Sequence, residues 1–131
     1  KTYCVVGDGE MNEGSNWEAI MAAAHYKVTS LIPIVDFNKR RIDGEVKDIM
    51  SIDPLGDKWR AFGFDVIEIN GHDFNELNDA IEKANAAVDR PVVIIAHTIK
   101  GKGIDFMEDE TKWHYGSIDS TVVEKAKASI A

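Results

Sequence analysis

The sequence has little cysteine and little proline: Cys4 is its single cysteine, and three prolines occur among 131 residues. One cysteine excludes an intramolecular disulfide and is typical of a protein in the reducing cytosol. The position of Cys4 inside an apolar run predicts a buried, inert thiol. We therefore expect a cytoplasmic protein that is stabilised by its core and not by covalent cross-links.

Positive charge is also scarce, because 15 basic residues face 23 acidic ones and the formal net charge is −8 at pH 7. A protein that binds nucleic acid normally presents a basic stripe to the phosphate backbone. We therefore expect no nucleic-acid partner. The local cluster Lys39-Arg40-Arg41 is consistent either with a solvated loop or with a contact for an anionic substrate or partner.

Long apolar runs are missing as well. No run approaches the roughly 18 residues that a membrane-spanning helix needs, and the first residues do not have the pattern of a signal peptide. The hydrophobic fraction of 44% and the charged fraction of 29% are ordinary for a globular protein. We expect one domain with a real core and no membrane partner.

Short apolar runs predict four strands, at residues 2–6, 31–35, 66–69 and 92–96. Helical spacing predicts helices at residues 16–26, at 58–62, after Asp73, and from about residue 121. Asp73 followed by Glu76 is a capping-box pattern. The apolar stripe of that helix is expected to consist of Phe74, Leu77, Ile81, Ala84 and Val88.

Strands that alternate with helices predict an α/β fold, in which a parallel sheet carries helices on both faces. Ligands of such folds bind outside the carboxyl ends of the strands. Three of the four predicted strands are followed there by an unusual loop. These loops contain the sequences GDGE, DFNKR and HTIKGKG, and we expect them to converge on one site.

The first of these loops combines glycines with acidic side chains. Gly7 and Gly9 permit a close approach of the backbone to a ligand, and the helix that follows offers unpaired N–H groups to a diphosphate. Asp8 would repel a diphosphate unless a cation lay between them. Mg²⁺ prefers oxygen ligands and commonly bridges protein groups and phosphates. A second oxygen ligand is expected from the next strand end, where Asn38 follows the GDG turn after 28 intervening residues.

Other phosphate-binding motifs do not fit this turn. Asn12 occupies the position of the third glycine in the dinucleotide fingerprint G-x-G-x-x-G, and no Walker sequence follows the first strand. The sequences GDGEMNEG, DFNKRRIDG, AHTIKGKGIDFMED and WHYG instead resemble the thiamine-diphosphate-binding domain of transketolases, in the same order. The HTIKGKG loop followed by WH narrows the resemblance to transketolase and its close relatives.

The resemblance implies roles for individual residues. Asp8, the Asn38 side chain and the main-chain carbonyl of Arg40 would ligate Mg²⁺, although Arg40 stands where relatives often have a small apolar residue. The cofactor-binding set, including the Gly9 amide for the diphosphate, would be Asp8, Gly9, Glu10, Asn38 and His114. The catalytic residues would be Glu13, in a carboxylate network between two thiamine sites, and His114, which would touch diphosphate or substrate.

The resemblance also implies that this chain is part of a larger enzyme. Residues 1–131 would be the C-terminal portion of the diphosphate-binding domain, either as a fragment or within an N-terminal subunit. The pyrimidine-binding domain, with the glutamate that activates the cofactor, would then lie outside these residues. The complete enzyme would transfer two-carbon ketol units between sugar phosphates, as a homodimer or with a complementary C-terminal subunit. The chain alone is expected to be catalytically incomplete.

Two other interpretations remain open at this stage. The cofactor could serve another reaction, that of 1-deoxyxylulose-5-phosphate synthase or of a 2-oxo acid dehydrogenase component. Alternatively, the chain could be a degenerate α/β domain that binds nucleotide or acts in assembly. The presence of both Asp8 and Asn38 argues against loss of the cation site.

Overall fold

A computed structural model of the chain describes residues 1–130. Four parallel strands form its sheet, in the order β1-β2-β6-β5. Their bounds are Thr2–Gly7 for β1, Leu31–Phe37 for β2, Asp65–Asn70 for β5 and Val92–His97 for β6. Three longer helices connect them: α1 at Gly14–His25, α3 at Leu55–Phe62 and α4 at Phe74–Ala86. The predicted α/β class is confirmed.

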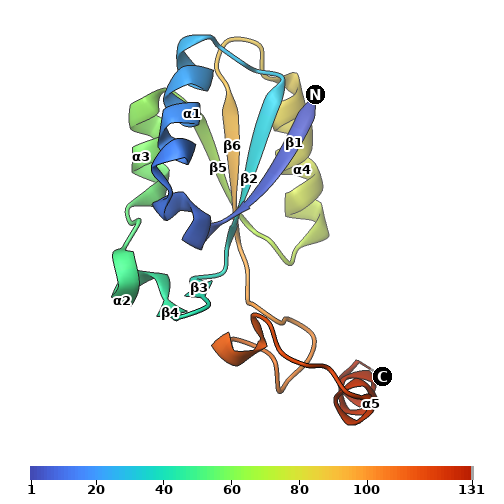
Figure 1. The fold of residues 1–131 in the computed structure, drawn as a ribbon. Coiled ribbons are helices and arrows are strands. Elements are labelled where there is room, and N and C mark those ends of the chain that lie inside the picture. The colour runs from blue at the N-terminus through green and yellow to red at the C-terminus, as the bar shows by residue number, and fades with distance from the viewer. Residues whose placement is uncertain (131) are drawn as a thin grey trace.

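The direction of each crossover decides which face its helix covers. The connections from β1 to β2 and from β2 to β5 run the same way across the sheet, whereas the chain returns from β5 to β6. Crossovers between parallel strands are right-handed, so a reversed direction places the helix on the opposite face. Accordingly, α1 and α3 cover one face and α4 covers the other (Figure 1).

Each face of the sheet has its own core. Alternate residues of the central strand β6 point to opposite sides, as the pleat requires. Val93 and Ile95 pack with Trp59 of α3 on one face. Ile94 packs with Ala84 of α4 on the other. Five consecutive apolar residues of β6 are buried, which explains why the sequence of this strand is a continuous hydrophobic run without alternation.

The connection between β2 and α3, in which only a helix at residues 58–62 was predicted, contains further structure. It contains a two-stranded hairpin of β3 at Arg40–Arg41 and β4 at Gly44–Glu45, followed by the short helix α2 at Val46–Met50. Helix α3 begins three residues earlier than the predicted start at Lys58. Val46 and Leu55 are buried in the core beside α1 and α3, so this connection is part of the domain.

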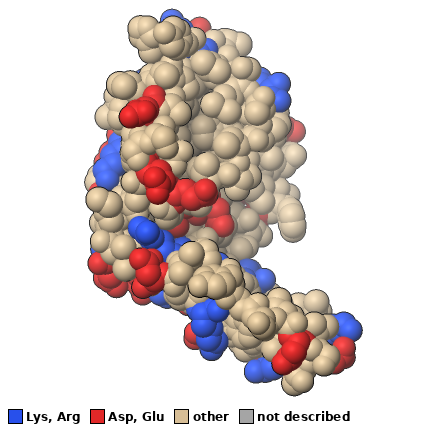
Figure 2. Space-filling view, viewed as in Figure 1, with Lys and Arg blue, Asp and Glu red and all other residues tan. Residues whose placement is uncertain are grey.

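The chain leaves the sheet after β6 and forms a separate C-terminal segment, residues 98–130. This segment contains a 3₁₀ turn, η2, at Thr111–Trp113 and helix α5 at Ser120–Ser129. It extends away from the end of the sheet at which the parallel strands terminate (Figures 1 and 2). Within residues 1–130, none of the helices has the length and apolar character needed to cross a membrane.

Several detailed predictions were wrong. Cys4 is exposed, because β1 is an edge strand that pairs only with β2. Phe74 is 87% exposed, and Val88, which is 78% exposed, lies beyond the end of α4, so the apolar stripe of this helix is shorter than predicted. Asp73 does cap α4 by accepting from the Asn75 and Glu76 amides, but Glu76 returns to the Asn70 N–H and not to Asp73.

Candidate functional site

The turn after β1 and the loop after β2 meet at the carboxyl edge of the sheet. The strands are neighbours in register, with Gly7 opposite Asp36. The Asp8 carboxylate accepts a hydrogen bond from the Lys39 N–H, one residue beyond Asn38. Lys39 holds a positive φ of 65°, a strained backbone conformation for a residue with a side chain. Asp8 and Asn38, predicted to lie at adjacent strand tips, are therefore brought to one place.

Asp8 is the one buried charged residue among those that the structure describes, at 1% exposure. Burial raises the pKa of its carboxyl from 3.8 to about 6, and the nearby charge of Asp36 adds to that rise. Hydrogen bonds from the Lys39 and Gly9 amides, together with the positive charge of Arg41, lower the pKa and offset part of the effect. A cation beside this carboxylate would stabilise its ionised form.

The GDG turn forms a 3₁₀ turn, η1, at Asp8–Asn12, and is closed from both sides. The Glu10 carboxylate accepts a hydrogen bond from the Gly7 N–H at 2.6 Å, so Glu10 turns back onto the strand end. Gly9 lies against Arg41, and a Cβ on Gly9 would come within 2.8 Å of the Arg41 Cγ. Arg41 in turn donates to the Asn12 side chain at 2.6 Å. The absence of a side chain at Gly9 thus lets the Arg41 side chain pack directly against the turn.

Asn38 belongs to a polar network that joins two strand ends. Its side-chain amide donates to Asp36 Oδ2 at 3.1 Å, and its Oδ1 accepts from the Arg40 N–H at 2.9 Å. The other oxygen of Asp36 accepts from the Thr98 hydroxyl, directly after β6. The orientation of the Asn38 side chain is therefore set by Asp36, whose own carboxylate is fixed by Thr98.

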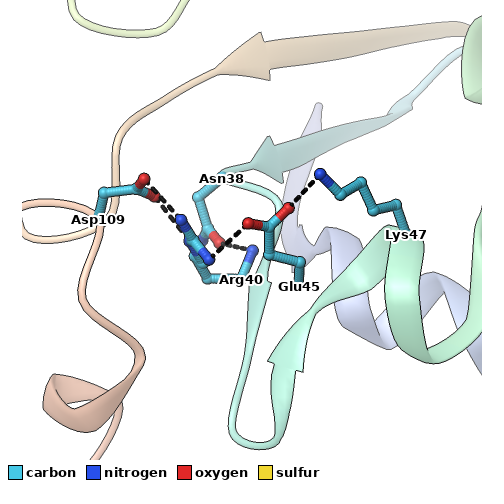
Figure 3. Close-up of polar contacts among 5 residues, drawn as sticks. All are labelled: Asn38, Arg40, Glu45, Lys47 and Asp109. Carbon is cyan, nitrogen blue, oxygen red and sulfur yellow. Dashed lines mark hydrogen bonds and ion pairs between the residues drawn. The ribbon is translucent and has the colours of Figure 1, made fainter.

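Arg40 lines a cleft between the strand tips and the C-terminal segment. Its guanidinium forms two bonds to Asp109, at 2.7 and 2.6 Å, and one to Glu45 at 3.1 Å; Glu45 also pairs with Lys47 (Figure 3). The cleft has a volume of about 550 Å³. Its lining residues are Phe37, Asn38, Lys39, Arg40, Glu45, His97, Thr98, Ile99, Glu108 and Asp109.

The Lys39-Arg40-Arg41 cluster is therefore not simply a solvated loop. The Arg40 and Arg41 side chains are 19% and 29% exposed, and both pair with acidic residues of the same chain. The acidic partner of Arg41 is Asp43, at 3.4 Å.

Neither of the two residues predicted to be catalytic has its side chain hydrogen-bonded to this network. Glu13 is exposed between η1 and α1, where its side chain makes no capping hydrogen bond. His114 is exposed directly after η2 in the C-terminal segment, with Tyr115 as the aromatic neighbour of its ring. Of the predicted residues, Asn38 and Arg40 line the cleft, whereas Asp8, Glu13 and His114 are not among its lining residues.

Acidic and hydroxyl partners of the site were missed by sequence reasoning. Asp36 precedes Asn38 by two residues at the same strand end, a position that could have identified it. Thr98 follows β6 inside a loop that was recognised, but its pairing with Asp36 requires knowledge of the strand order. Asp109 is 69 residues from Arg40, and no local pattern indicates that contact.

A cluster of three or more His, Cys, Asp and Glu side chains able to hold a metal does not occur within residues 1–130. The predicted ligand set contains only one such side chain, Asp8, because its other members are an amide and a main-chain carbonyl. Mg²⁺ commonly uses one or two protein groups and takes its remaining oxygens from phosphates and water. The absence of an acidic cluster therefore does not decide against this set.

Known proteins provide independent information on the family. Residues 1–131 match the family model described as transketolase, thiamine diphosphate binding domain. An apulose-4-phosphate transketolase subunit from Phocaeicola vulgatus is 38% identical over 131 residues, 100% of this chain and 47% of the relative. Its namesake from Actinobacillus succinogenes is 47% identical over 115 residues, 88% of this chain and 41% of the relative. The chain thus spans about half the length of these relatives.

The fold leads to the same family. The crystal structure of a transketolase from Campylobacter jejuni superimposes with a TM-score of 0.91 at 36% sequence identity, covering 99% of this chain and 20% of that one. The alternative families considered from the sequence are not favoured by these similarities. This chain therefore belongs to the transketolase family, as a thiamine-diphosphate-binding domain.

Proposed function

We propose that the chain binds the Mg²⁺-diphosphate end of thiamine diphosphate in a transketolase that moves two-carbon ketol units between sugar phosphates. The observation that carries the proposal is the buried Asp8 carboxylate, joined to the loop of Asn38 through the Lys39 amide. Both side chains offer oxygen atoms at adjacent strand ends, where ligands of parallel sheets bind.

The residues present fit such a cofactor. Burial disfavours ionised Asp8, and a divalent cation would restore the ionised form as a ligand. Asp8 and the Asn38 oxygen would hold Mg²⁺ together with the Arg40 carbonyl. Gly9 has no side chain to block an approaching diphosphate, and its N–H would bind that group in our proposal.

We also propose roles for Glu10, which was predicted to bind the cofactor, and for Glu13 and His114, which were predicted to be catalytic. Glu10 closes the turn onto Gly7, which would fix the shape of the diphosphate cradle. Glu13 is exposed and accessible to a neighbouring protein chain, which a carboxylate network between two sites would require. His114 would contact diphosphate or substrate from the C-terminal segment. Thiamine diphosphate, when bound, supplies the electron sink for breaking a carbon–carbon bond, and the protein positions it.

The proposal includes further protein. Residues 1–131 would be the C-terminal portion of the diphosphate-binding domain, and a separate pyrimidine-binding domain would supply the glutamate that activates the cofactor. Two relatives are named as subunits of a transketolase, which supports a complementary chain as partner; a homodimer is the other arrangement. The substrates would be sugar phosphates, in line with the apulose-4-phosphate in those names. We place the enzyme in the cytoplasm, which the single cysteine supports.

A transfer assay tests this function. The complete natural polypeptide, combined with its complementary chain where that is separate, is incubated with Mg²⁺, thiamine diphosphate, a ketose phosphate and an aldose. We expect a new ketose lengthened by two carbons, whose formation depends on both Mg²⁺ and cofactor. The 131-residue chain alone should give no product. Product from the chain alone, or none from the complete enzyme with any sugar phosphate, would contradict the proposal.

A further inference from the structure

Arg40 connects three parts of the chain through its side chain. Two of its nitrogens donate to the two carboxylate oxygens of Asp109, and the third donates to Glu45, which lies directly opposite on the β3–β4 hairpin. A guanidinium bound to both oxygens of one carboxylate is held in orientation as well as attracted by charge. The Arg40 side chain is 19% exposed and the Asp109 side chain is 59% exposed, so solvent reaches this pair from the Asp109 side and the bidentate geometry carries more of the contact than burial does.

The backbone of Arg40 is part of the site described above. Its N–H donates to Asn38 Oδ1 at 2.9 Å, close along the chain to the hydrogen bond between Asp8 and Lys39. A shift of the Arg40 guanidinium would therefore move the peptide group that orients Asn38. The same residue thus binds the site loop through its main chain and the C-terminal segment through its side chain.

The C-terminal segment has few other attachments to the sheet. At its start, Thr98 donates to Asp36 and the Ile99 N–H donates to His72. Farther along, the segment packs on itself, with Phe106 against Trp113 at 5.5 Å and Lys125 above the Phe106 ring at 4.3 Å. The pair with Arg40 thus attaches this self-packed unit at a point well beyond its departure from the sheet.

We propose that the Arg40–Asp109 ion pair is a clamp that couples docking of the C-terminal segment, residues 98–130, to assembly of the cofactor site. This inference rests on the proposed function, since it concerns the same site. Docking fixes Arg40, and Arg40 in turn fixes the loop that carries Asn38. By linkage, cofactor binding should stabilise the docked segment to the same extent that docking favours cofactor binding. Arg40 is thus a positioning residue.

The chain offers well-matched variants for a test. Asp109 has a φ of 59°, a conformation that asparagine tolerates, so Asp109→Asn removes the charge with little backbone cost. Arg40→Leu removes the guanidinium, and Arg40→Lys keeps the charge without the two-pronged geometry. Lys47→Met is the control, because the ion pair of Lys47 is with Glu45, at 2.8 Å, and not with the C-terminal segment.

The experiment uses the complete natural polypeptide, with its complementary chain where that is separate. Calorimetric titration gives the affinity for thiamine diphosphate with Mg²⁺. Hydrogen exchange follows amides 100–130 with and without the cofactor, and thermal unfolding checks that each variant folds. We expect Arg40→Leu and Asp109→Asn to weaken cofactor binding by roughly 2- to 5-fold each, the effect of losing a partly exposed ion pair. The variant that carries both substitutions should bind the cofactor no more weakly than either single variant does, because both substitutions remove the same ion pair.

The exchange data should show the reciprocal effect. In the wild-type protein the cofactor should slow exchange of amides 100–130, and in Arg40→Leu and Asp109→Asn it should not. Lys47→Met should behave as wild type, and Arg40→Lys should fall between wild type and Arg40→Leu. If folded Arg40→Leu and Asp109→Asn bind cofactor as well as Lys47→Met does, the clamp is wrong while the proposed function stands. If the wild-type protein shows no Mg²⁺-dependent binding, the proposed function fails and the coupling fails with it.

Discussion

The carboxylate of Asp8 accepts the main-chain N–H of Lys39, which joins the turn after β1 directly to the loop after β2. The bond connects two segments 31 residues apart and lies beneath the surface, where Asp8 is 1% exposed. A buried carboxylate with few compensating charges destabilises the folded state. Such a cost at a strand tip is typical of a site that is arranged for a ligand.

Asp8→Asn should raise the stability of the metal-free protein and weaken its binding of the cofactor. Asparagine keeps an oxygen that can accept from Lys39 but removes the buried charge. We therefore expect the free energy of unfolding of the metal-free protein at pH 7 to rise by about 1–3 kcal/mol, given that one pKa unit corresponds to about 1.4 kcal/mol. Mg²⁺-dependent binding of thiamine diphosphate should fall by at least roughly tenfold, because a charged ligand is lost. Chemical denaturation and titration calorimetry measure the two effects.

The stabilisation by Asp8→Asn should depend on pH. The pKa of Asp8 is raised to about 6 in the folded chain from 3.8, so the folded state binds the proton more tightly than the unfolded state does. In the wild type, the contribution of Asp8 to the free energy of unfolding is fully present below about pH 4, and it is lost as the pH rises through about 6. The stability difference between Asp8→Asn and wild type should therefore be largest above about pH 6 and vanish near about pH 4. A difference that is constant across this range would contradict the raised pKa.

Gly9→Ala should damage the site through a single methyl group. An added Cβ would lie 2.8 Å from the Arg41 Cγ, which must move and would strain its bond to Asn12. Overpacking of this kind costs about 1–3 kcal/mol. Gly14→Ala is the matched control, because a Cβ there would meet nothing within 4 Å. We expect the unfolding temperature and the cofactor affinity to be lower in Gly9→Ala than in the wild type. Both should stay near the wild-type values in Gly14→Ala.

Thr98→Val should loosen the connection between β2 and β6. The valine keeps the shape of the side chain but removes the hydroxyl that donates to Asp36, which leaves one carboxylate oxygen without that partner. Loss of a hydrogen bond to a charged group costs about 1.5–3 kcal/mol. Thr98→Ser keeps the hydroxyl and should retain most of the stability. Loss of stability in the serine variant but not in the valine variant, measured by urea denaturation, would show that the methyl group and not the hydroxyl matters.

The fold could be predicted from the sequence where hydrophobic period and chain breaks were strong. The continuous apolar run at residues 92–96 and the Asp73 cap predicted β6 and the start of α4 close to their observed positions. The convergence of three loops on one sheet edge followed from parallel topology alone. Asp8 and Asn38 were predicted as site residues because an acidic residue in a glycine turn suggests a cation, and Asn38 lies at the end of the next strand; their roles stay a prediction.

Other features depend on contacts that no local pattern encodes. Cys4 is exposed because β1 lies at the edge of the sheet, and strand order is not visible in a run of apolar residues. The β3–β4 hairpin was missed because each of its strands has only two residues. The contact between Arg40 and Asp109 spans 69 residues and depends on where the C-terminal segment docks.

Titration of thiamine diphosphate into the complete natural protein, with Mg²⁺ and then with a chelator in its place, tests the central claim most directly. The account predicts saturable heat with Mg²⁺ that disappears in the chelator and is strongly reduced in Asp8→Asn and in Asn38→Ala. Lys47→Met should match the wild type. Binding that is equally strong with the chelator, or unchanged in both site variants, would contradict a magnesium-bridged diphosphate at the tips of β1 and β2.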